Sequence, residues 1–519
     1  MIKFKAGRMV CLAVAFMFIF AALFTGCGAS KNASTQAPSS VQPAAQLTEE
    51  KKPEYTEVIW YVPQPTANNQ DRESVMAEVN KTFMEKLNCK LNMVLCNNDN
   101  NAYSQKIKVM SASGEAFDIF SAGGYLNMPV TNLVATGAVA PVDDLLNNYG
   151  KSILNKVDAK YWSAVTVDGK KYAMINPMVW AYSRGFVFKK DLVDKYQFDY
   201  KSVHNLKDLE PFLKTLKEKE PDIIPLAAAP GSDNLPGLGY ETDTESIIPK
   251  YAIYFDYNSG TFKYWWENQE QKDKYTVLAD YFKKGYISKN ASTVKDLVTE
   301  EKSQKYAVCR DAGQYDETGA KSTNFFGFPT YESFYSTTPI STSSVTICLN
   351  CISSTSKNSE RAMMLLDLLN MDKKLFNTLC FGLENQNYTV ESGAGTDNPT
   401  VKRTADSKWL MLQPWIGDLY ESWPSDLNGE DALNAMKKST ESASLSPIFG
   451  FAFDNEPVKK EIAQINTMMA DIDILSTGAV SDVNKFYDDI QTKLTKAGIE
   501  NVMKEVQKQY NDWKVKNGK

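Results

Sequence analysis

The residues of this 519-residue chain that could do chemistry are its cysteines, its acidic pairs and its single histidine. Cys348 and Cys351 have the C-x-x-C spacing of redox motifs, in which the start of a helix lowers a thiol pKa. Their flanks favour a strand, so we expect two small buried side chains instead. His204 precedes a helical pattern, where it would cap the helix or lie on the surface. A single histidine also excludes multi-histidine zinc sites.

Enzyme motifs are missing from the sequence. There is no G-x-S-x-G, no P-loop and no cluster of metal ligands. Adjacent acids such as Asp143–Asp144 and Asp488–Asp489 lie on solvated helical stretches, which is not typical of a catalytic carboxylate pair. We therefore expect a protein that is not an enzyme and has neither a cofactor nor a metal.

The amino-terminal segment has the pattern of a secretory signal. Lys3, Lys5 and Arg8 precede an apolar run of 16 residues, Met9–Phe24, which is shorter than the ~20 residues of a membrane span. The following Thr-Gly-Cys27 resembles the bacterial lipobox, in which the cysteine is acylated, for example with palmitate, after cleavage. We expect a signal peptide over residues 1–26 and a lipid on Cys27; the alternative is an ordinary signal with an incidental cysteine.

Residues 27–54 follow as a segment of Ser, Ala, Asn, Thr, Gln and Pro with almost no large apolar side chain. Such a composition cannot bury enough surface to order itself, so we expect a disordered tether. The whole chain has a formal charge of -6, and removal of the signal takes away three basic residues. Because no basic stripe remains to neutralise phosphates, nucleic acid is excluded as a partner.

The rest of the chain is long enough for two lobes. For residues 58–120, hydrophobic periodicity predicts the order strand, helix, strand, helix, strand, as in a parallel sheet covered by helices. Residues 251–264 predict a hairpin around Asn-Ser-Gly. Further helices are predicted at 269–284, 358–370, 372–380, 457–475, 480–495 and 500–513. The loops at 63–69 and 121–127 follow strands, where ligands collect in such sheets.

Several stretches resemble the extracellular solute-binding proteins of ABC importers. Phe117-Asp-Ile-Phe120 with Leu133–Leu145 matches a strand and helix of that family, and Val167–Pro177 and Phe186–Leu192 match its next two motifs. The carboxyl half is similar to the larger, LipO-like lipoproteins of Gram-positive bacteria. That similarity is carried by Asn358–Met363, Phe381–Tyr388, Pro447–Asp454, Pro457–Glu461, Lys496–Glu500 and Gln507–Trp513.

This resemblance implies a two-lobed α/β protein with the type II periplasmic-binding-protein fold. Each lobe would be a mostly parallel sheet with flanking helices, joined by hinge strands near Ser183, Tyr306 and Asn350. Lobe 1 would comprise residues 55–182 with 307–349, and lobe 2 residues 183–306 with 350–519. Closure of the lobes around a ligand, most often an oligosaccharide, would present it to an ABC permease. The protein would be a monomer on the outer face of the cell membrane.

An oligosaccharide offers hydroxyls and weakly apolar faces. A receptor therefore needs aromatic planes for stacking and carboxylates, amides or Arg for hydrogen bonds. The candidate loops and the hinge supply these types, at Gln64, Asn68, Gly124, Tyr125, Trp180, Tyr182, Arg310, Asp311, Glu384, Asn387, Trp415 and Trp423.

Each candidate has a structural alternative. Arg310 and Asp311 could pair with each other, Glu384 could cap a helix, and Trp415 and Trp423 could be core residues. Trp60, Trp162 and Trp265 are expected in the core. Two other functions stay open beside the importer: a surface carbohydrate-active enzyme with distant carboxylates, and a ligand sensor or adhesin on the same fold.

Overall fold

The computed structural model describes residues 54–64, 69–96, 99–231, 243–310, 315–426 and 428–518. Cys27, Asn68 and Asp311 lie outside the described residues, as do the expected signal peptide and nearly all of the tether. Among the described helices, none combines the length and the apolar character that spanning a membrane requires.

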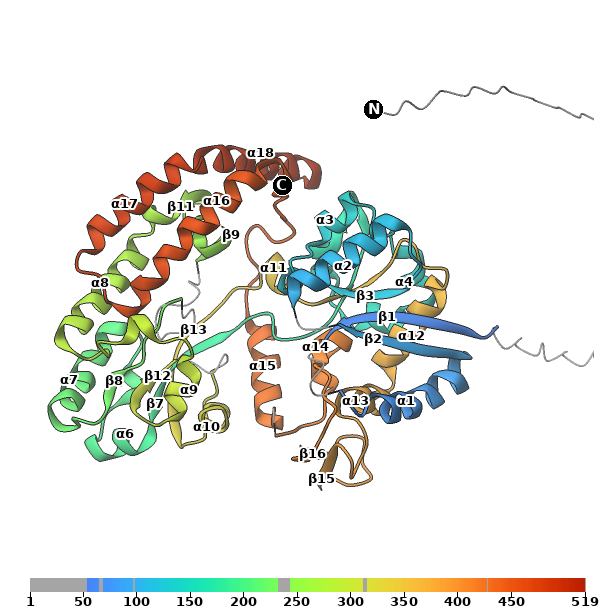
Figure 1. Ribbon diagram of the computed structural model, residues 1–519, viewed down its shortest axis with the longest axis horizontal. Coiled ribbons are helices and arrows are strands. Elements are labelled where there is room, and N and C mark those ends of the chain that lie inside the picture. Colours follow the sequence, from blue (N-terminus) through green and yellow to red (C-terminus); the bar gives the residue numbers. More distant parts are fainter. Residues whose placement is uncertain are drawn as a thin grey trace, which may run out of the picture. The chain divides into compact units, whose positions relative to one another are not determined.

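The first sheet is built from the predicted strand–helix repeat. Its strand order is β2-β1-β3-β14-β6, with β1 parallel to β2 and β3, and with β14 antiparallel to its two neighbours. Apolar residues of each strand are buried, because helices cover the sheet (Figure 1). The bounds are β1 Thr56–Pro63, α1 Arg72–Leu87, β2 Cys89–Cys96, α2 Asn100–Ser113, β3 Ile119–Ala122, α3 Val130–Ala135, α4 Asp143–Tyr149, α5 Lys151–Lys156, β6 Met174–Ile175, β14 Leu349–Ile352, α12 Ser359–Met371 and α13 Lys373–Phe381.

The second sheet has the order β13-β7-β12-β8. Here β7 is antiparallel to both β13 and β12, and only β12 and β8 are parallel. Both sheets are mixed, because β14 and β7 run against their neighbours. The other strands of each sheet share one direction, as expected. The bounds are β7 Ser183–Lys189, α6 Lys190–Tyr196, α7 Glu210–Lys219, β8 Ile224–Leu226, α8 Gln269–Lys284, α9 Leu297–Lys302, β12 Tyr306–Cys309, α10 Ala320–Phe326 and β13 Thr330–Thr337.

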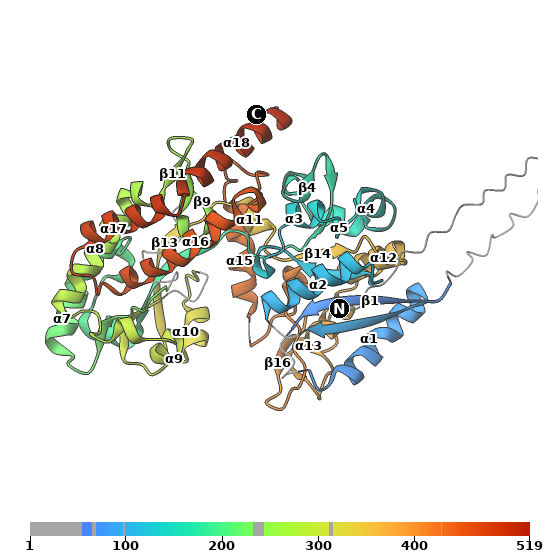
Figure 2. The same cartoon turned by 45° about the horizontal axis from the view of Figure 1, so that its top comes forward.

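Smaller elements complete the chain. The predicted hairpin is confirmed, since Asp256 pairs with Thr261, and the predicted carboxyl-terminal helices are present. In Figures 1 and 2, α16–α18 lie along α8 and the small sheet β11-β10-β9. The bounds are β4 Thr166–Val167, β5 Lys170–Lys171, β9 Thr244–Ile248, β10 Ile253–Asp256, β11 Thr261–Tyr264, α11 Thr342–Val345, β15 Tyr388–Ser392, β16 Thr400–Arg403, α14 Gln413–Ile416, α15 Glu430–Ser442, α16 Lys459–Met469, α17 Val483–Lys496 and α18 Ile499–Asn517.

Buried apolar side chains form two cores. The first core takes residues from Val58–Ala181 and Ile340–Met436, together with Phe449. The second core takes residues from Phe186–Phe328 and Ile448–Val506. Trp60 and Trp162 lie in the first core and Trp265 lies in the second, as predicted.

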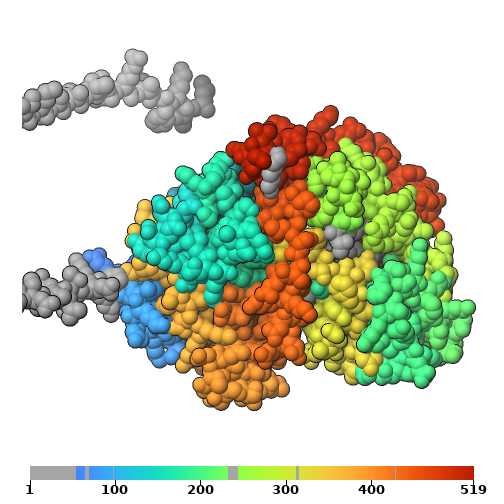
Figure 3. All heavy atoms as spheres, turned by 180° about the vertical axis from the view of Figure 1, so that it is seen from behind, coloured from blue at the N-terminus to red at the C-terminus, as the bar shows by residue number. Residues whose placement is uncertain are grey.

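The chain passes between the cores in three places that are hydrogen-bonded to one another. The Thr338 N–H donates to the Tyr182 carbonyl (3.0 Å), and the Ile340 N–H donates to the Ser444 carbonyl (2.8 Å). The Ser439 hydroxyl, on α15, donates to the Ala181 carbonyl (2.8 Å). The outer face of α15 is exposed when the molecule is seen from behind (Figure 3).

These crossings correct two of the three expected positions. The first crossing does lie at Ser183. Tyr306, however, lies within the second sheet and Asn350 within the first, so the chain crosses near Thr338 and Ser446 instead. The ranges 307–349 and 350–519 were accordingly assigned to the wrong lobes over much of their length. The sequence of a four-residue apolar strand does not indicate which sheet the strand will join, because strand pairing depends on distant segments.

The cysteines and the single histidine are not placed for chemistry. The six described cysteines are all buried and free, and burial raises the pKa of Cys348 to about 12. A thiol with such a pKa is not a redox nucleophile. His204 is exposed, and the capping residue beside it is Asn205, whose side chain accepts hydrogen bonds from the N–H groups of Lys207 and Asp208.

Candidate functional site

The carboxyl ends of β1, β3 and β6 meet at one edge of the first sheet. Gln64 follows β1, Gly123–Tyr125 follows β3, and Asn176 follows β6. Because β14 is antiparallel to β3, its amino-terminal end lies at the same edge. Ligands of α/β proteins collect at such edges, so the search for a site begins there.

Tyr125 and Trp415 come together at this edge from segments that are far apart in the sequence. Their ring centroids are 5.7 Å apart, with the planes tilted by 58°. Tyr125 is 52% exposed, whereas Trp415 is buried. The contact therefore offers one accessible aromatic ring that is supported from below by another, which is a suitable platform for the apolar face of a ligand.

Backbone geometry fixes the position of Tyr125. Gly123 has a φ of 113°, and a side chain there would collide with the carbonyl oxygens of Thr346 and Ile347. The next two N–H groups, of Gly124 and Tyr125, donate to these same two carbonyls at 3.0 and 3.2 Å. Only glycine permits this approach, so the turn that carries Tyr125 is held against the start of β14.

Three buried amide side chains hold the segment that carries Trp415. The Asn176 amide donates to the Pro414 carbonyl (2.7 Å), and the Gln64 amide donates to the Leu410 carbonyl. The Asn350 amide donates to the Ile416 carbonyl (3.4 Å). We call Gln64, Asn176 and Asn350 the amide row. Gln64 was predicted from its loop, but Asn176 and Asn350 were not predicted as site residues.

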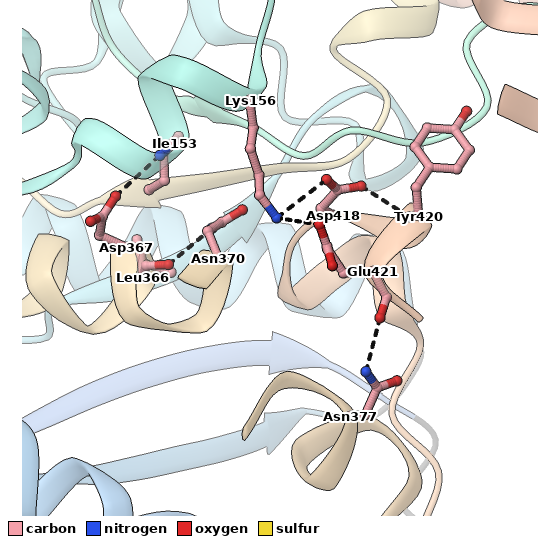
Figure 4. A network of polar contacts seen from close by, with 9 residues as sticks. All are labelled: Ile153, Lys156, Leu366, Asp367, Asn370, Asn377, Asp418, Tyr420 and Glu421. Carbon is pink, nitrogen blue, oxygen red and sulfur yellow. Dashed lines mark hydrogen bonds and ion pairs between the residues drawn. The ribbon is translucent and has the colours of Figure 1, made fainter. Parts of the chain in front are cut away.

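A polar network fixes the residues that follow this segment (Figure 4). Lys156 on α5 forms ion pairs with Glu421 (2.6 Å) and Asp418 (3.7 Å). Asp418 is buried, and this burial raises the pKa of its carboxyl to about 6, although Lys156 lowers it in part. The Asn377 amide donates to the Glu421 carbonyl (2.9 Å). Residues 418–421, which lie beyond the Trp415 segment, are thus tied to α5 and α13.

The hinge residues Trp180 and Tyr182 lie beside the first crossing. Trp180 is buried, with its ring in edge contact with Tyr161 at 4.7 Å. Tyr182 is partly exposed and lies under the Arg184 guanidinium, 5.1 Å from its ring. The structure therefore leaves Tyr182 accessible and encloses Trp180.

Arg310 has a partner other than the one considered. Its guanidinium lies 3.6 Å from the fully buried Glu301 carboxylate, and the backbone N–H of Arg310 donates to the same carboxylate at 2.8 Å. Burial raises the pKa of Glu301 to about 7, and Arg310 lowers it in part. This pairing explains Arg310 as a residue that neutralises a buried acid.

The remaining predicted residues lie in the part of the first core beyond α13. The Asn387 amide, which is fully buried, donates to Asp71 (2.7 Å), and Glu384 is an exposed loop residue. Trp423 is buried, donates to the Asp397 carbonyl (3.0 Å) and stacks on Phe381. Neither Asn387 nor Trp423 is brought to the Tyr125 edge by any of these contacts.

Tyr315 and Phe334 form an aromatic pair that the sequence analysis missed. Their rings are 5.5 Å apart in an edge contact, and Phe334 is 43% exposed. The Tyr315 ring lies so close to Gly185 that a side chain there would approach it within 3.0 Å. Phe334 lies in a stretch of β13 that is rich in aromatic residues, Tyr331 to Tyr335, and this composition was the available signal.

A groove of about 980 Å³ lies between the second core's last helix and the first core. Lys516 at the end of α18 forms an ion pair at the rim of this groove with Asp168 in the β4–β5 turn.

The described residues include no group of three or more His, Cys, Asp or Glu side chains that could hold a metal ion.

Comparison with known proteins agrees with this architecture. Residues 66–308 match the family "Bacterial extracellular solute-binding protein", and residues 447–515 match "Domain of unknown function (DUF3502)". The chain is 29% identical over 462 residues to a "Carbohydrate ABC transporter substrate-binding protein" of Streptococcus pneumoniae serotype 4, covering 85% of this chain and 88% of that protein.

Solved structures are similar over most of the chain. The N-glycan transport solute binding protein of Streptococcus pneumoniae has 26% sequence identity and a TM-score of 0.73, covering 90% of this chain and 100% of that one. The same protein in complex with Man1GlcNAc has 25% identity and a TM-score of 0.64, covering 88% and 99%. With its two mixed sheets and its hydrogen-bonded crossings, the chain is thus similar over most of its length to bacterial extracellular solute-binding proteins, whose family model matches residues 66–308.

Proposed function

We propose that this protein binds an oligosaccharide outside the cell and delivers it to the permease of an ABC importer. As a solute-binding protein it is the non-enzymatic component of a transporter. Support for an oligosaccharide comes from the relatives, one of which is named for carbohydrate and another of which was solved with Man1GlcNAc. The observation in this chain that carries the proposal is the exposed Tyr125 ring supported by Trp415.

The chemistry of the edge suits a sugar. A pyranose has a weakly apolar face that stacks on an aromatic ring, and hydroxyls that need donors and acceptors. Tyr125 and Trp415 offer the aromatic plane. Gly124 leaves the backbone beside Tyr125 accessible, because no other part of the protein lies within 4 Å of the position that a Cβ atom would take there. Asn68, Tyr182 and Asp311 stay as proposed contacts, while Arg310, Glu384, Asn387 and Trp423 are not needed for this site.

We propose that the two lobes close around the ligand, so that the loaded form differs in shape from the empty one. The three hydrogen-bonded crossings near Ser183, Thr338 and Ser446 are short segments that can absorb such a change. A monomer that closes in this way would present a single surface to the permease.

We also propose that the protein is held at the membrane by a lipid on Cys27. The Thr-Gly-Cys27 sequence after an apolar run supports cleavage and acylation there, and the composition of residues 28–53 supports a flexible tether. Replacing Cys27 with Ser should release the protein into the medium and abolish labelling by radioactive palmitate. If oligosaccharide binding were lost as well, the tether and the receptor would not be separate parts.

Calorimetric titration with mannose- and N-acetylglucosamine-containing oligosaccharides tests the function. We expect saturable binding without hydrolysis of the sugar, together with an upward shift of Tm. A ligand at a hundredfold excess over Kd stabilises the folded state by about 2.7 kcal/mol. Chromatography of the recovered sugar is the control for turnover, and a panel that gives neither heat nor a Tm shift would contradict the proposal.

A further inference from the structure

The amide row lies along one face of the first sheet at its carboxyl edge. Asn350 pairs with Ser121 on β3 and with Met174 on β6, so these side chains share a face. Asn176, two residues after Met174, points to the same face because side chains alternate along a strand. Gln64 occupies the equivalent place after Val62 of β1. The three amides thus come from β1, β6 and β14.

All three side chains are buried and donate in the same direction. Gln64 is 1%, Asn176 4% and Asn350 1% exposed. Each amide donates to a carbonyl of residues 410–416, a stretch that contains only one turn of helix, α14, and whose carbonyls therefore need partners outside it. Trp415 lies between two of the three bonded carbonyls, those of Pro414 and Ile416.

Two backbone hydrogen bonds attach the chain on either side of Trp415 and leave the residues between them to the amides. The Met411 N–H donates to the Cys380 carbonyl (3.1 Å), and the Leu419 N–H donates to the Pro177 carbonyl (2.8 Å). Leu412 on the stretch is 42% exposed. Between Met411 and Leu419, the hydrogen bonds that join the backbone to the sheet, among the residues that the structure describes, are those of Asn176 and Asn350.

We propose that Asn176 and Asn350, assisted by Gln64, are positioning residues that hold Trp415 under Tyr125 and thereby set the affinity for the ligand. This inference rests on the proposed oligosaccharide function, since it assigns the residues that shape that site. The amides act through Trp415 and do not contact the sugar. Neutral amides suit this role because they can donate from a buried position without the desolvation cost of a charge.

Asn377 provides a matched control in the same core. It is fully buried, and its amide donates to the carbonyls of Lys373 (2.8 Å) and Glu421 (2.9 Å). Its side-chain oxygen accepts from the Trp423 N–H (2.8 Å). Asn377 thus holds a different tryptophan by the same kind of bond, so Asn377→Leu shows what the loss of a buried amide does to stability alone.

The experiment uses the mature chain labelled with 5-fluorotryptophan. Fluorine NMR spectra are recorded for wild type, Asn176→Leu, Asn350→Leu, Gln64→Met and Asn377→Leu, and Trp415→Phe and Trp423→Phe assign the two resonances. We expect each of the first three variants to shift or broaden the Trp415 resonance but not that of Trp423, with the opposite pattern in Asn377→Leu. Three separate variants keep the test usable if one of them fails to fold.

Affinity for a mannose- and N-acetylglucosamine-containing oligosaccharide is then measured by calorimetry. We expect Asn176→Leu and Asn350→Leu to weaken binding by about tenfold or more, and Asn377→Leu to leave it unchanged although all three lower Tm. An unchanged Trp415 resonance, or an equal loss of affinity in Asn377→Leu, overturns the inference. If wild type binds no oligosaccharide, the proposed function fails, while the resonances still report separately whether the amides position Trp415.

Discussion

The two sheets of this protein hold their carboxyl edges together by different chemistry. At the edge of the first sheet, the buried groups that hold the Trp415 segment are the neutral amides of Gln64, Asn176 and Asn350. At the edge of the second sheet they are carboxylates: Glu301 lies against Arg310, and Glu332 accepts from the Asp316 N–H at 3.0 Å.

The difference shows how residues at equivalent places in two sheets can serve different ends. Amides attach a neighbouring segment without titrating, and they leave the Tyr125 ring free at the surface. A buried carboxylate needs a cation or N–H groups to remain charged, so Arg310 is already committed to Glu301. A cationic side chain that follows a strand is therefore weaker evidence for a ligand site than an exposed ring with buried support.

The largest effect should separate the two tryptophans predicted as ligand contacts. We expect Trp423→Ala to lower the free energy of unfolding by about 3–5 kcal/mol, because the buried ring leaves a cavity beside Phe381 and Tyr388. The sugar affinity of the folded protein should not change. Denaturant titration and calorimetry measure the two quantities, and Trp415→Ala, which should abolish most of the affinity, is the comparison variant. Equal losses of affinity would place Trp423 in the site.

A pH dependence of stability should come from the carboxylates and not from the amide row. Burial disfavours the charged form of Glu301 and raises the pKa of its carboxyl from the ordinary value of 4.5 to about 7 in the folded protein. The folded state therefore holds the proton more tightly, and this stabilisation is complete below pH 4.5 and is lost as the pH rises to about 7. Glu245, with a pKa also about 7, adds to the same window.

Each pKa unit corresponds to about 1.4 kcal/mol, so we expect Glu301→Gln to remove up to about 3 kcal/mol of the fall in unfolding free energy between pH 4.5 and 7. Denaturant titrations at several pH values measure this slope. Glu245→Gln should remove a further part of this fall, and the Asp418 carboxyl, whose pKa burial raises to about 6, should contribute to the rest. A slope that is the same in wild type and Glu301→Gln would mean that Glu301 titrates normally.

Removing Arg310, the cation at the carboxyl edge of the second sheet, should lower the stability of the protein without changing its affinity for the ligand. Arg310→Leu leaves the Glu301 carboxylate without its counter-charge, and we expect a loss of about 2 kcal/mol of stability at pH 8. The loss should shrink at pH 5, where Glu301 is protonated. Oligosaccharide affinity serves as the discriminating measurement, because a large decrease at unchanged Tm would return Arg310 to the ligand site.

We expect the smallest effect at Tyr125, which lies on the surface at the carboxyl edge of the first sheet. Tyr125→Ala removes an exposed ring, so Tm should change little, while affinity should fall by about tenfold, which is ~1.4 kcal/mol. Tyr125→Phe keeps the plane and should retain most of the affinity. If Tyr125→Ala binds as well as wild type, the proposed platform is not the binding surface.

Much of the fold was predictable from local patterns. The period of four in α1, the alternation in β2 and the turn between β10 and β11 each follow from a few neighbouring residues, and the structure confirms these elements. The site was predictable only in part. Gly124 and Tyr125 follow a predicted strand, but nothing local distinguishes Trp415 from Trp423, since both lie beside proline in an irregular stretch.

The sequence by itself determined the elements, the family that they resemble and the loop that presents Tyr125, because these depend on periodicity, composition and ordered motifs. Tertiary structure decided which sheet β12 and β14 join, where the chain crosses between the cores, and that Arg310 pairs with Glu301. It also decided that Asn176 and Asn350 hold the Trp415 segment. Such choices depend on contacts between separate elements of the chain, whose free energies are settled only when the complete chain packs.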